Sequence, residues 1–519
     1  IEDVLYAAPK AAGYPIPPGL QIVKRIDGRA YFDLTAILWC LYDFAGLLPE
    51  RVAVAIGGHQ PTIPVPPGDP LAGPEGERRR RAFRTLAWRM LRFPAELRRA
   101  IKAQFKAVRA ILDAPPADAA GILAAFERLA KLHETFNPIV GLANGYGDGF
   151  RESVLAKLRP VAGDRAEQLL TRLVAGVGGV ASAEQGFRIQ DLATIAKGDF
   201  AALEWLKTRG TDWTSLPATS AFRGEIDRFL KDFGHRAVYE ADVLNPRWGD
   251  DPSYLLDQVR AHLDFEPLRR DAARGIRDEA WKEVKKKVPF WKRPVLSWLL
   301  GRMRWGYAAR ENAKSALAAS MWPTRRLALQ CGRLLKLPRP ELAFHLAKAD
   351  LQSYLEGTWD GAGAAELALD REARREEWLK RPDPPDVVVE GGSLAARPAA
   401  TPIVDDSSWR GIAVSSGRAE GKARLVRHPG DGVRLARGEV LVAPSTDPGW
   451  TPLFLRAGAL VTESGGYLSH GAIVAREFGI PAVVNIPGVM GVVQEGESLA
   501  VDGDLGVVTR IAKGTTAPS

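Results

Sequence analysis

The stretch Ser445–Gly488 reads STDPGWTPLFLRAGALVTESGGYLSHGAIVAREFGIPAVVNIPG. Its apolar run Ala459–Thr462 predicts a short buried strand, and the glycine pair that follows permits a sharp turn of the backbone. Ser469 is a preferred N-cap residue, so His470 is expected in the first turn of a helix that continues through Gly471–Phe478. The stretch therefore predicts a strand, a glycine turn and a helix that starts at a histidine.

A histidine in this position has two chemical properties of a phosphoryl carrier. The helix dipole disfavours the protonated imidazole, so a ring nitrogen keeps its lone pair for nucleophilic attack. The free N–H groups of the first helical turn can hold the phosphoryl group once it is attached. His470 is therefore the predicted phosphoryl acceptor, and the predicted phosphate-binding neighbours are Gly465, Gly466, Ser469, Gly471 and Arg476.

Two alternatives belong beside this prediction. Arg476 lies near the end of the predicted helix, where capping of the last carbonyl groups is an equally good role for an arginine. Most single histidines are hydrogen-bonded structural residues, and that is the interpretation for the following: His59, His133, His262, His345 and His428.

The rest of the quoted stretch and the residues on both sides of it continue a pattern of short β-like runs bounded by glycines. These predicted strands are Ala423–Val426, Val440–Ala443, Ala482–Ile486, Ser498–Val501 and Val507–Ile511. They predict a compact β/α domain over residues 411–519, a usual size for an independently folding unit. Residues 381–410 are rich in Pro, Ala, Gly and Ser, which predicts a flexible linker with a root-mean-square span of roughly 25 to 30 Å.

Residues 1–380 show a helical pattern instead. One apolar stripe recurs at spacings of three and four: Leu97, Ile101, Phe105, Val108 and Leu112. Before it, Gln21–Leu48 predicts a small mixed element of two strands, a turn at Asp27-Gly28 and a helix. The expected fold class is multidomain α and α/β, with a large, mostly helical domain followed by the small β/α domain.

Composition narrows the class of protein. A chain of 519 residues with 46% hydrophobic residues can bury large cores. No apolar run is long enough for a membrane span, and only Cys40 and Cys331 occur, so no membrane, no disulfide framework and a cytoplasmic location are expected. The net charge of +9 suits an anionic partner, but the basic run Arg78–Arg81 adjoins Leu86 and Trp88 and favours a solvated helix face. Nucleic-acid binding is not expected.

A second group of residues with chemical potential is Arg310, Glu311 and Lys314 in GYAARENAKSAL. Arg310 and Lys314 are four residues apart, so both cations project from one helix face and can grip a transferring phosphoryl group. Glu311 can accept a proton from a hydroxyl group. The alternative is a solvated helix face with intrahelical ion pairs.

A third group lies in FLKDFGHRAVYEADVLNPRWGDDPSYLL, Phe229–Leu256. Its charged residues are Arg236, Glu240, Asp242 and Arg247. They predict a charge-rich turn, which either contributes to an acceptor site or forms a buried salt-bridge network that anchors helices.

The order of GG, SHGAIVARE and GIPAVV resembles the phosphohistidine domain of the phosphoenolpyruvate-utilising enzymes, and DPGWTPLF is similar to the rifampin phosphotransferase branch. The Arg-Glu-x-x-Lys pattern at Arg310 and the segment Phe229–Leu256 are similar to the acceptor domain of that branch. The resemblance implies a phosphotransferase with paired acceptors, in which a swivelling domain passes a phosphoryl group through a phosphohistidine intermediate at His470. Family members often have a regulatory Thr two residues before the histidine, and this chain has Leu468 there.

The resemblance also implies parts that this sequence lacks. It has no Gly-rich nucleotide loop followed by carboxylates for Mg²⁺, so we expect ATP and Mg²⁺ on an ATP-grasp domain that is either a removed region or a separate subunit, and no metal site here. Only about 50 residues follow His470, too few for a pyruvate-binding barrel. The expected acceptor is a hydrophobic, hydroxylated small molecule, rifamycin-like or phenolic, and antibiotic resistance is the implied role.

Two other functions stay open. The chain is a non-catalytic relay, phosphorylated at His470, whose helical part binds a ligand or partner, or it is a basic scaffold for nucleic acid. Replacement of His470 by Ala separates them: it abolishes transfer in the favoured case, phosphorylation alone in the relay, and nothing in the scaffold.

Overall fold

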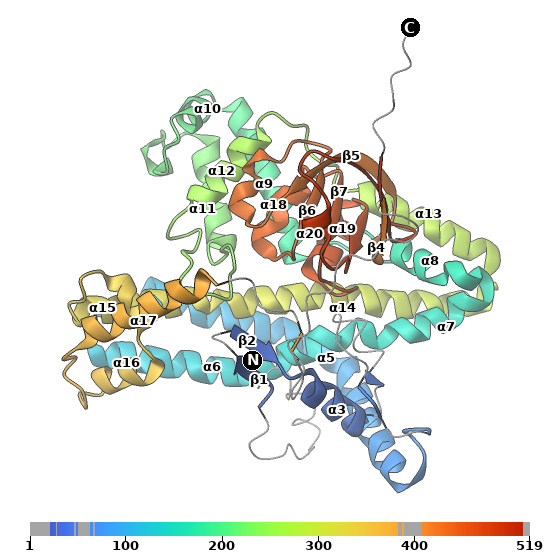
Figure 1. Cartoon of the computed structure of the whole chain (residues 1–519), viewed down its shortest axis with the longest axis horizontal. Coiled ribbons are helices and arrows are strands. Elements are labelled where there is room, and N and C mark those ends of the chain that lie inside the picture. The colour runs from blue at the N-terminus through green and yellow to red at the C-terminus, as the bar shows by residue number, and fades with distance from the viewer. Residues whose placement is uncertain are drawn as a thin grey trace.

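The computed structural model describes residues 21–26, 29–45, 48–49, 63–65, 68–381, 387–388 and 407–511. Residues 68–381 form a helical body, and residues 407–511 form a β/α domain that lies against the middle of it (Figure 1). The predicted class, a large helical part followed by a small β/α domain, is therefore confirmed. Most of the predicted linker, residues 381–410, lies outside the described residues.

The small N-terminal element has the predicted strands and helix. Strands β1 (Val23–Ile26) and β2 (Arg29–Phe32) pair antiparallel, and helix α3 (Leu34–Ala45) follows and packs on α5. Asp33 starts this helix, because its Oδ1 accepts a hydrogen bond from Ala36 N at 2.9 Å. The predicted turn at Asp27-Gly28 lies outside the described residues.

Long helices form the base of the helical body. Helices α5 (Gly73–Asp113), α6 (Ala119–Tyr146) and α14 (Arg293–Ala319) pack together along the long axis of the molecule (Figure 1). Leu97 and Val108 of the predicted stripe are buried on α5. None of the helices in the described ranges combines the length and the apolar character that a bilayer crossing requires.

Shorter helices complete the body and support the β/α domain. They are α7 (Arg151–Ala162), α8 (Ala166–Leu173), α9 (Ala181–Gly198), α10 (Phe200–Lys207), α11 (Ala221–Phe233), α12 (Ser253–His262), α13 (Ala272–Lys287), α15 (Met321–Leu334), α16 (Lys348–Leu355) and α17 (Ala364–Leu379). Helix α9 packs on α11 and α12. It also packs on two helices of the β/α domain, α18 (Thr451–Phe454) and α19 (His470–Phe478). It is the main contact between the two parts.

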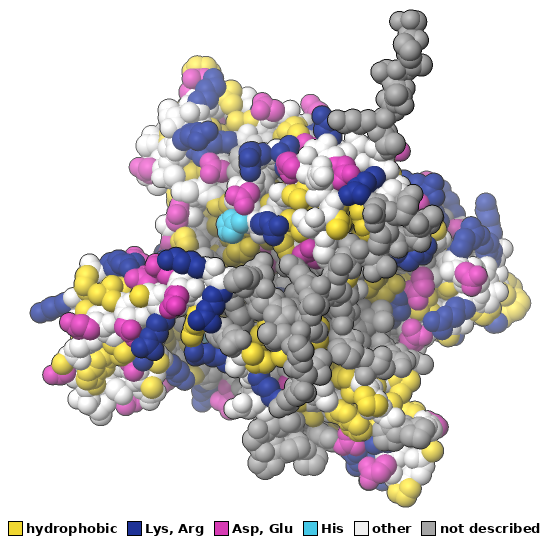
Figure 2. Space-filling view, viewed as in Figure 1, with side chains coloured by type: hydrophobic (Ala, Val, Ile, Leu, Met, Phe, Trp, Pro, Cys, Tyr) yellow, Lys and Arg dark blue, Asp and Glu magenta, His cyan; other side chains and the backbone are white. Residues whose placement is uncertain are grey.

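The basic run at the start of α5 forms ion pairs. Arg80 and Arg84 are exposed and both pair with Glu77, at 2.8 and 3.2 Å. Figure 2 shows Lys and Arg side chains interspersed with Asp and Glu over the visible face. This part of the run is therefore a solvated helix face, as predicted, whereas Arg79 is largely buried and pairs with Asp43 at 3.0 Å. The absence of nucleic-acid binding stays a prediction.

The β/α domain is built on an eight-stranded sheet with the order β3-β10-β9-β5-β6-β7-β8-β4. Its strands are β3 (Ser408–Arg410), β4 (Ile412–Ser415), β5 (Arg418–Leu425), β6 (Val440–Ala443), β7 (Ala459–Thr462), β8 (Ala482–Val484), β9 (Ser498–Asp502) and β10 (Val507–Arg510). Strands β5 to β8 pair parallel, which requires crossover segments, and these contain α18 (Thr451–Phe454) and α19 (His470–Phe478). The helix α20 (Val489–Val492) follows β8.

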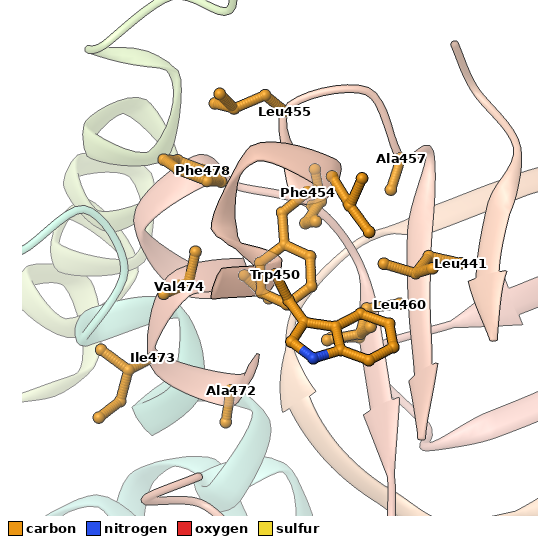
Figure 3. Close-up of a cluster of buried hydrophobic side chains, with 14 of the residues drawn as sticks. Leu441, Trp450, Phe454, Leu455, Ala457, Leu460, Ala472, Ile473, Val474 and Phe478 are labelled. Carbon is orange, nitrogen blue, oxygen red and sulfur yellow. The ribbon is translucent and has the colours of Figure 1, made fainter. Parts of the chain in front are cut away.

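Alternation along the strands divides the core of this domain into two faces. Val440 and Val442 of β6 face one cluster, whereas Leu441 and Ala443 face the cluster under α18 and α19. Figure 3 shows the second cluster, with Trp450 and Leu441 toward the sheet and Phe478 toward the neighbouring helices. This cluster also includes side chains of the helical body: Val180, Ala183, Phe187 and Ala308. The two parts thus share one hydrophobic core.

Candidate functional site

His470 is the first residue of α19, and Ser469 is its N-cap, with Oγ accepting from Ala472 N at 3.3 Å. The histidine is 8% exposed. Its Nδ1 lies 3.0 Å from Glu311 Oε2 on α14, and its Nε2 lies 3.2 Å from Thr451 Oγ1. Phe454 stacks on the ring at a centroid distance of 6.2 Å. The imidazole is therefore held between its own domain and the helical body.

Glu311 is a buried carboxylate surrounded by donors. Besides His470, Arg310 Nη1 donates to Oε1 at 2.8 Å and Ser182 Oγ donates to Oε2 at 3.1 Å. Burial raises the pKa of Glu311, but the hydrogen bond from His470 and the charges of its neighbours lower it further, so the net pKa is well below the usual range. Because an ionised carboxylate has no proton, the hydrogen at Nδ1 belongs to the imidazole, and in the neutral ring the lone pair is then on Nε2.

Arg310 and Lys314 flank this carboxylate on α14. The side chain of Arg310 is 13% exposed and that of Glu311 is 2% exposed, so the alternative of a solvated helix face is wrong, although an Arg310–Glu311 ion pair exists. Burial, and then the charge of Arg310, lower the pKa of Lys314 to about 8. Two largely buried cations beside a histidine form an environment that stabilises a transferring phosphoryl group.

Three further residues belong to the site, and the sequence reasoning did not single them out. Ser182 bonds Glu311, and Thr451 bonds His470. Thr451 lies within the DPGWTPLF motif, and this motif is the sequence signal that could have identified it. Asp447 joins the two parts, since its Oδ2 accepts from Tyr239 N at 2.9 Å and its Oδ1 accepts from Gly449 N at 2.9 Å. Burial, with a contribution from Glu240, raises the pKa of Asp447 to about 6.

The predicted phosphate-binding glycines lie around the start of α19. Gly465 has φ of +139°, a backbone conformation that favours glycine, and Gly466 accepts a hydrogen bond from Ser469 N at 2.9 Å. At Gly471 a side chain would meet Thr446 Oγ1 at 2.7 Å, so close packing explains that glycine. Their contact with phosphate stays a prediction.

Arg476 has a different environment from the one expected of a phosphate ligand. Its guanidinium donates to Val414 O at 3.0 Å and to Tyr467 O at 2.9 Å, and it lies 5.2 Å from the ring centroid of Tyr307. It connects α19 to β4 and to the loop before His470. The observed contacts of Arg476 are therefore structural. They do not cap the end of the helix, and phosphate binding by Arg476 stays a prediction.

The charge-rich turn is largely buried. Arg236 donates to both carboxylate oxygens of Glu240, at 2.8 and 3.1 Å, and Arg247 donates to Glu240 O at 2.8 Å and Asp242 O at 3.0 Å. Asp242 lies 4.0 Å from Arg375. Within the described residues, Nε and Nη2 of Arg236 have no hydrogen-bond partner. The alternative of a buried network fits these contacts, and the unpartnered donors leave an acceptor role open.

The other described histidines have polar partners. Those predicted to be structural contact the following residues: His133 contacts Ser320, His262 contacts Gln258, His345 contacts Glu372 and His428 contacts Gly430. His59 lies outside the described residues. His235, which the sequence reasoning did not consider, is buried and bonded to Ser315 Oγ at 3.1 Å.

Comparison with known proteins agrees with this arrangement. Residues 145–311 match the rifampicin phosphotransferase fourth domain, and residues 435–506 match the mobile domain of PEP-utilising enzymes. The helical part is thus similar to the rifampicin phosphotransferases, and the β/α domain is similar to the PEP-utilising enzymes. Glu311 is the last residue of the first match, and His470 lies within the second. The contact between them thus joins the two family domains.

Curated relatives match more than half of the chain. The chain is 31% identical over 302 residues to the prodigiosin synthesizing transferase PigC of Serratia marcescens, covering 56% of this chain and 34% of the relative. It is 28% identical to a rifampicin phosphotransferase of Streptomyces sviceus and 26% identical to one of Bacillus cereus, covering 64% and 63% of this chain and 40% and 39% of the relatives. The chain therefore spans between a third and two fifths of the length of these relatives.

Proposed function

We propose that this chain is the acceptor and carrier portion of an ATP-dependent phosphotransferase. In this proposal His470 receives a phosphoryl group from ATP on an ATP-grasp domain or subunit and then swivels to deliver it to a hydroxyl group beside Arg310 and Lys314. The observation that supports it most is the 3.0 Å contact between His470 Nδ1 and Glu311 across the two parts. Since ATP is the proposed donor, the cytoplasm is the expected compartment.

The chemistry of both steps follows from the tautomer of His470. Nε2, which has the lone pair, attacks the phosphorus, the N–P bond forms and a P–O bond of ATP breaks. In the second step the acceptor oxygen attacks phosphorus, the N–P bond breaks and the neutral imidazole is restored. Arg310 and Lys314 neutralise the charge of the phosphoryl group during this transfer.

The acceptor hydroxyl must also lose a proton. The sequence predicted Glu311 as the base, but this carboxylate already accepts hydrogen bonds from Arg310, Ser182 and His470 and has a lowered pKa. We assign Glu311 the role of orienting the imidazole instead. Lys314, with a pKa of about 8, is the ionisable side chain beside it that can exchange a proton near neutral pH.

The proposed acceptor is a hydrophobic, hydroxylated small molecule bound by the helical body. The rifampicin phosphotransferases among the relatives support a rifamycin-like acceptor and a role in antibiotic resistance. The PigC relative, named for prodigiosin synthesis, supports a biosynthetic acceptor as the second candidate. In the described part of the chain, Nε and Nη2 of the buried Arg236 have no hydrogen-bond partner. These donors are suited to bind the acceptor or its phosphate.

Intact mass at alkaline pH, where phosphohistidine survives, tests the carrier role. The chain is mixed with an ATP-grasp partner, Mg²⁺ and ATP, beside a His470→Ala control. We expect the gain of one phosphoryl group in the wild type alone. Equal masses before and after mixing, with an ATP-grasp domain that phosphorylates its own partner, would exclude both the carrier and the phosphorylated relay. Binding of a ligand by the helical body would then be the better interpretation.

A further inference from the structure

The carboxylate of Glu477 on α19 also bonds the helical body directly. Glu477 is 6% exposed, and its two oxygens accept hydrogen bonds from Val177 N at 2.7 Å and Gly178 N at 2.8 Å. Beside this contact, Gly176 N donates to Arg476 O at 3.1 Å. Three consecutive backbone N–H groups of the helical body are thus bonded to the last turns of α19.

The backbone of residues 176–179 is shaped for this contact. Gly176, Gly178 and Gly179 have φ values of +55°, +76° and +69°, a left-handed conformation in which neighbouring N–H groups converge on one anion. Arg277 fixes the turn from α13 by donating to Gly176 O at 2.6 Å. The glycine turn is therefore a preformed receptor for a carboxylate.

The glycine turn is also connected to the residues around His470. Asn312, next to Glu311 on α14, donates to Gly179 O at 2.9 Å and accepts from Ala181 N at 2.9 Å. Ser182, which bonds Glu311, is in the first turn of α9 directly after the turn. A displacement of the turn would therefore move Ser182, which bonds Glu311, and disturb the contacts of Asn312 beside it.

We propose that Glu477 is a positioning residue, which holds the β/α domain on the helical body in the orientation where His470 meets Glu311. This inference rests on the proposed function, because it assigns Glu477 to the delivery position of a domain that moves. Loading of His470 takes place elsewhere, so Glu477 should serve delivery and leave loading unaffected.

The test variant is Glu477→Gln in the whole chain. A glutamine has one acceptor oxygen, and its NH₂ group would face one of the two N–H donors, so one charge-assisted hydrogen bond is replaced by repulsion. We expect hydrogen exchange of the amides of residues 176–182 to accelerate by about tenfold or more. The matched control is Glu420→Gln, since Glu420 is an exposed carboxylate on β5 of the same domain.

Two further readouts separate positioning from a structural role. Amides of β6 and β7 should exchange as in the wild type, and loading of His470 by an ATP-grasp protein, Mg²⁺ and ATP, followed by mass, should not slow. Unchanged exchange at residues 176–182 would overturn the proposal. Faster hydrogen exchange in β6 and β7 as well, or slower loading of His470, would show that Glu477 stabilises the fold of the β/α domain, and would overturn the positioning role. If even the wild type is never loaded, the proposed function fails, and the exchange result still decides the role of Glu477.

Discussion

Glu311 holds the imidazole of His470 from the Nδ1 side, and Thr451 meets the opposite nitrogen. A histidine, a carboxylate and an arginine are therefore assembled within one buried site. In the proposed function, the hydroxyl of Thr451 lies where the phosphoryl group binds, so this hydrogen bond would break when Nε2 is phosphorylated.

Glu311→Gln tests the orienting role. The amide can donate a hydrogen to Nδ1, which would favour the tautomer with the proton on Nε2 and block the nucleophile. We expect phosphoryl transfer to fall on the order of 10²-fold or more. Two-dimensional ¹⁵N NMR of the imidazole should report a shift of the proton from Nδ1 to Nε2. Glu283→Gln, on α13 away from the histidine, is the control, and the same tautomer in all three proteins would refute the assignment.

Asp447 gives a prediction on pH. Its pKa is raised from 3.8 to about 6, so its contribution to stability is complete below pH 3.8 and is lost as the pH rises through about 6. A shift of this size corresponds to about 3 kcal/mol in the free energy of unfolding. Asp447→Asn should remove this decline of stability with rising pH, and it can also shift the free energy of unfolding equally at every pH. Denaturant unfolding between pH 4 and pH 7.5 checks it, and parallel pH curves for the two proteins would contradict it.

Between elements, the fit of α9 to α19 is set by Gly186. A Cβ at this position would lie 2.9 Å from Phe478 Cζ and 3.0 Å from Thr451 Cγ2, both closer than van der Waals contact. Glycine lets the two helices approach, and Phe187 then stacks edge-on against Phe478 at a centroid distance of 5.0 Å. The close approach of the β/α domain to α9 therefore requires glycine at position 186, because alanine would add a methyl group at this contact.

Gly186→Ala should weaken docking of the β/α domain while leaving α9 intact. Alanine is a better helix former than glycine by about 1 kcal/mol, so a loss of stability would come from the contact and not from the helix. Gly198→Ala, on the same helix with nothing within 4 Å of its Cβ, is the control and should be neutral or stabilising. Small-angle scattering should detect a more extended molecule for Gly186→Ala alone. Identical scattering from both variants would rule out this role of Gly186.

The sequence predicted elements whose signals are local. Ser469 as N-cap, the start of α19 and the apolar runs of β6 and β7 follow from neighbouring residues, and the structure confirms them. Strands β3 and β4 were missed. They are the two edge strands of the sheet and form by pairing with β10 and β8, which lie far along the chain. The segment Ala482–Ile486 was predicted too long, since β8 ends at Val484.

At the scale of the molecule, the partners of the site come from distant parts of the chain. Glu311 and His470 are 159 positions apart. No local pattern could show that Glu311 bonds this histidine, or that Ser182 bonds the same carboxylate. The residue types of the site were therefore predictable from motifs, whereas their roles depend on how the two parts dock.

The hydrophobic core that the two parts share gives this docking a thermal signature. Docking removes Phe187, Val180 and the facing side chains of α18 and α19 from water, which lowers the heat capacity of the docked state. The hydrophobic stabilisation that results becomes weaker on cooling. The β/α domain should therefore separate more readily at 5 °C than at 25 °C, although most of its contacts are the same at both temperatures. In the proposed function this domain leaves the helical body to be recharged, so low temperature should slow delivery more than loading.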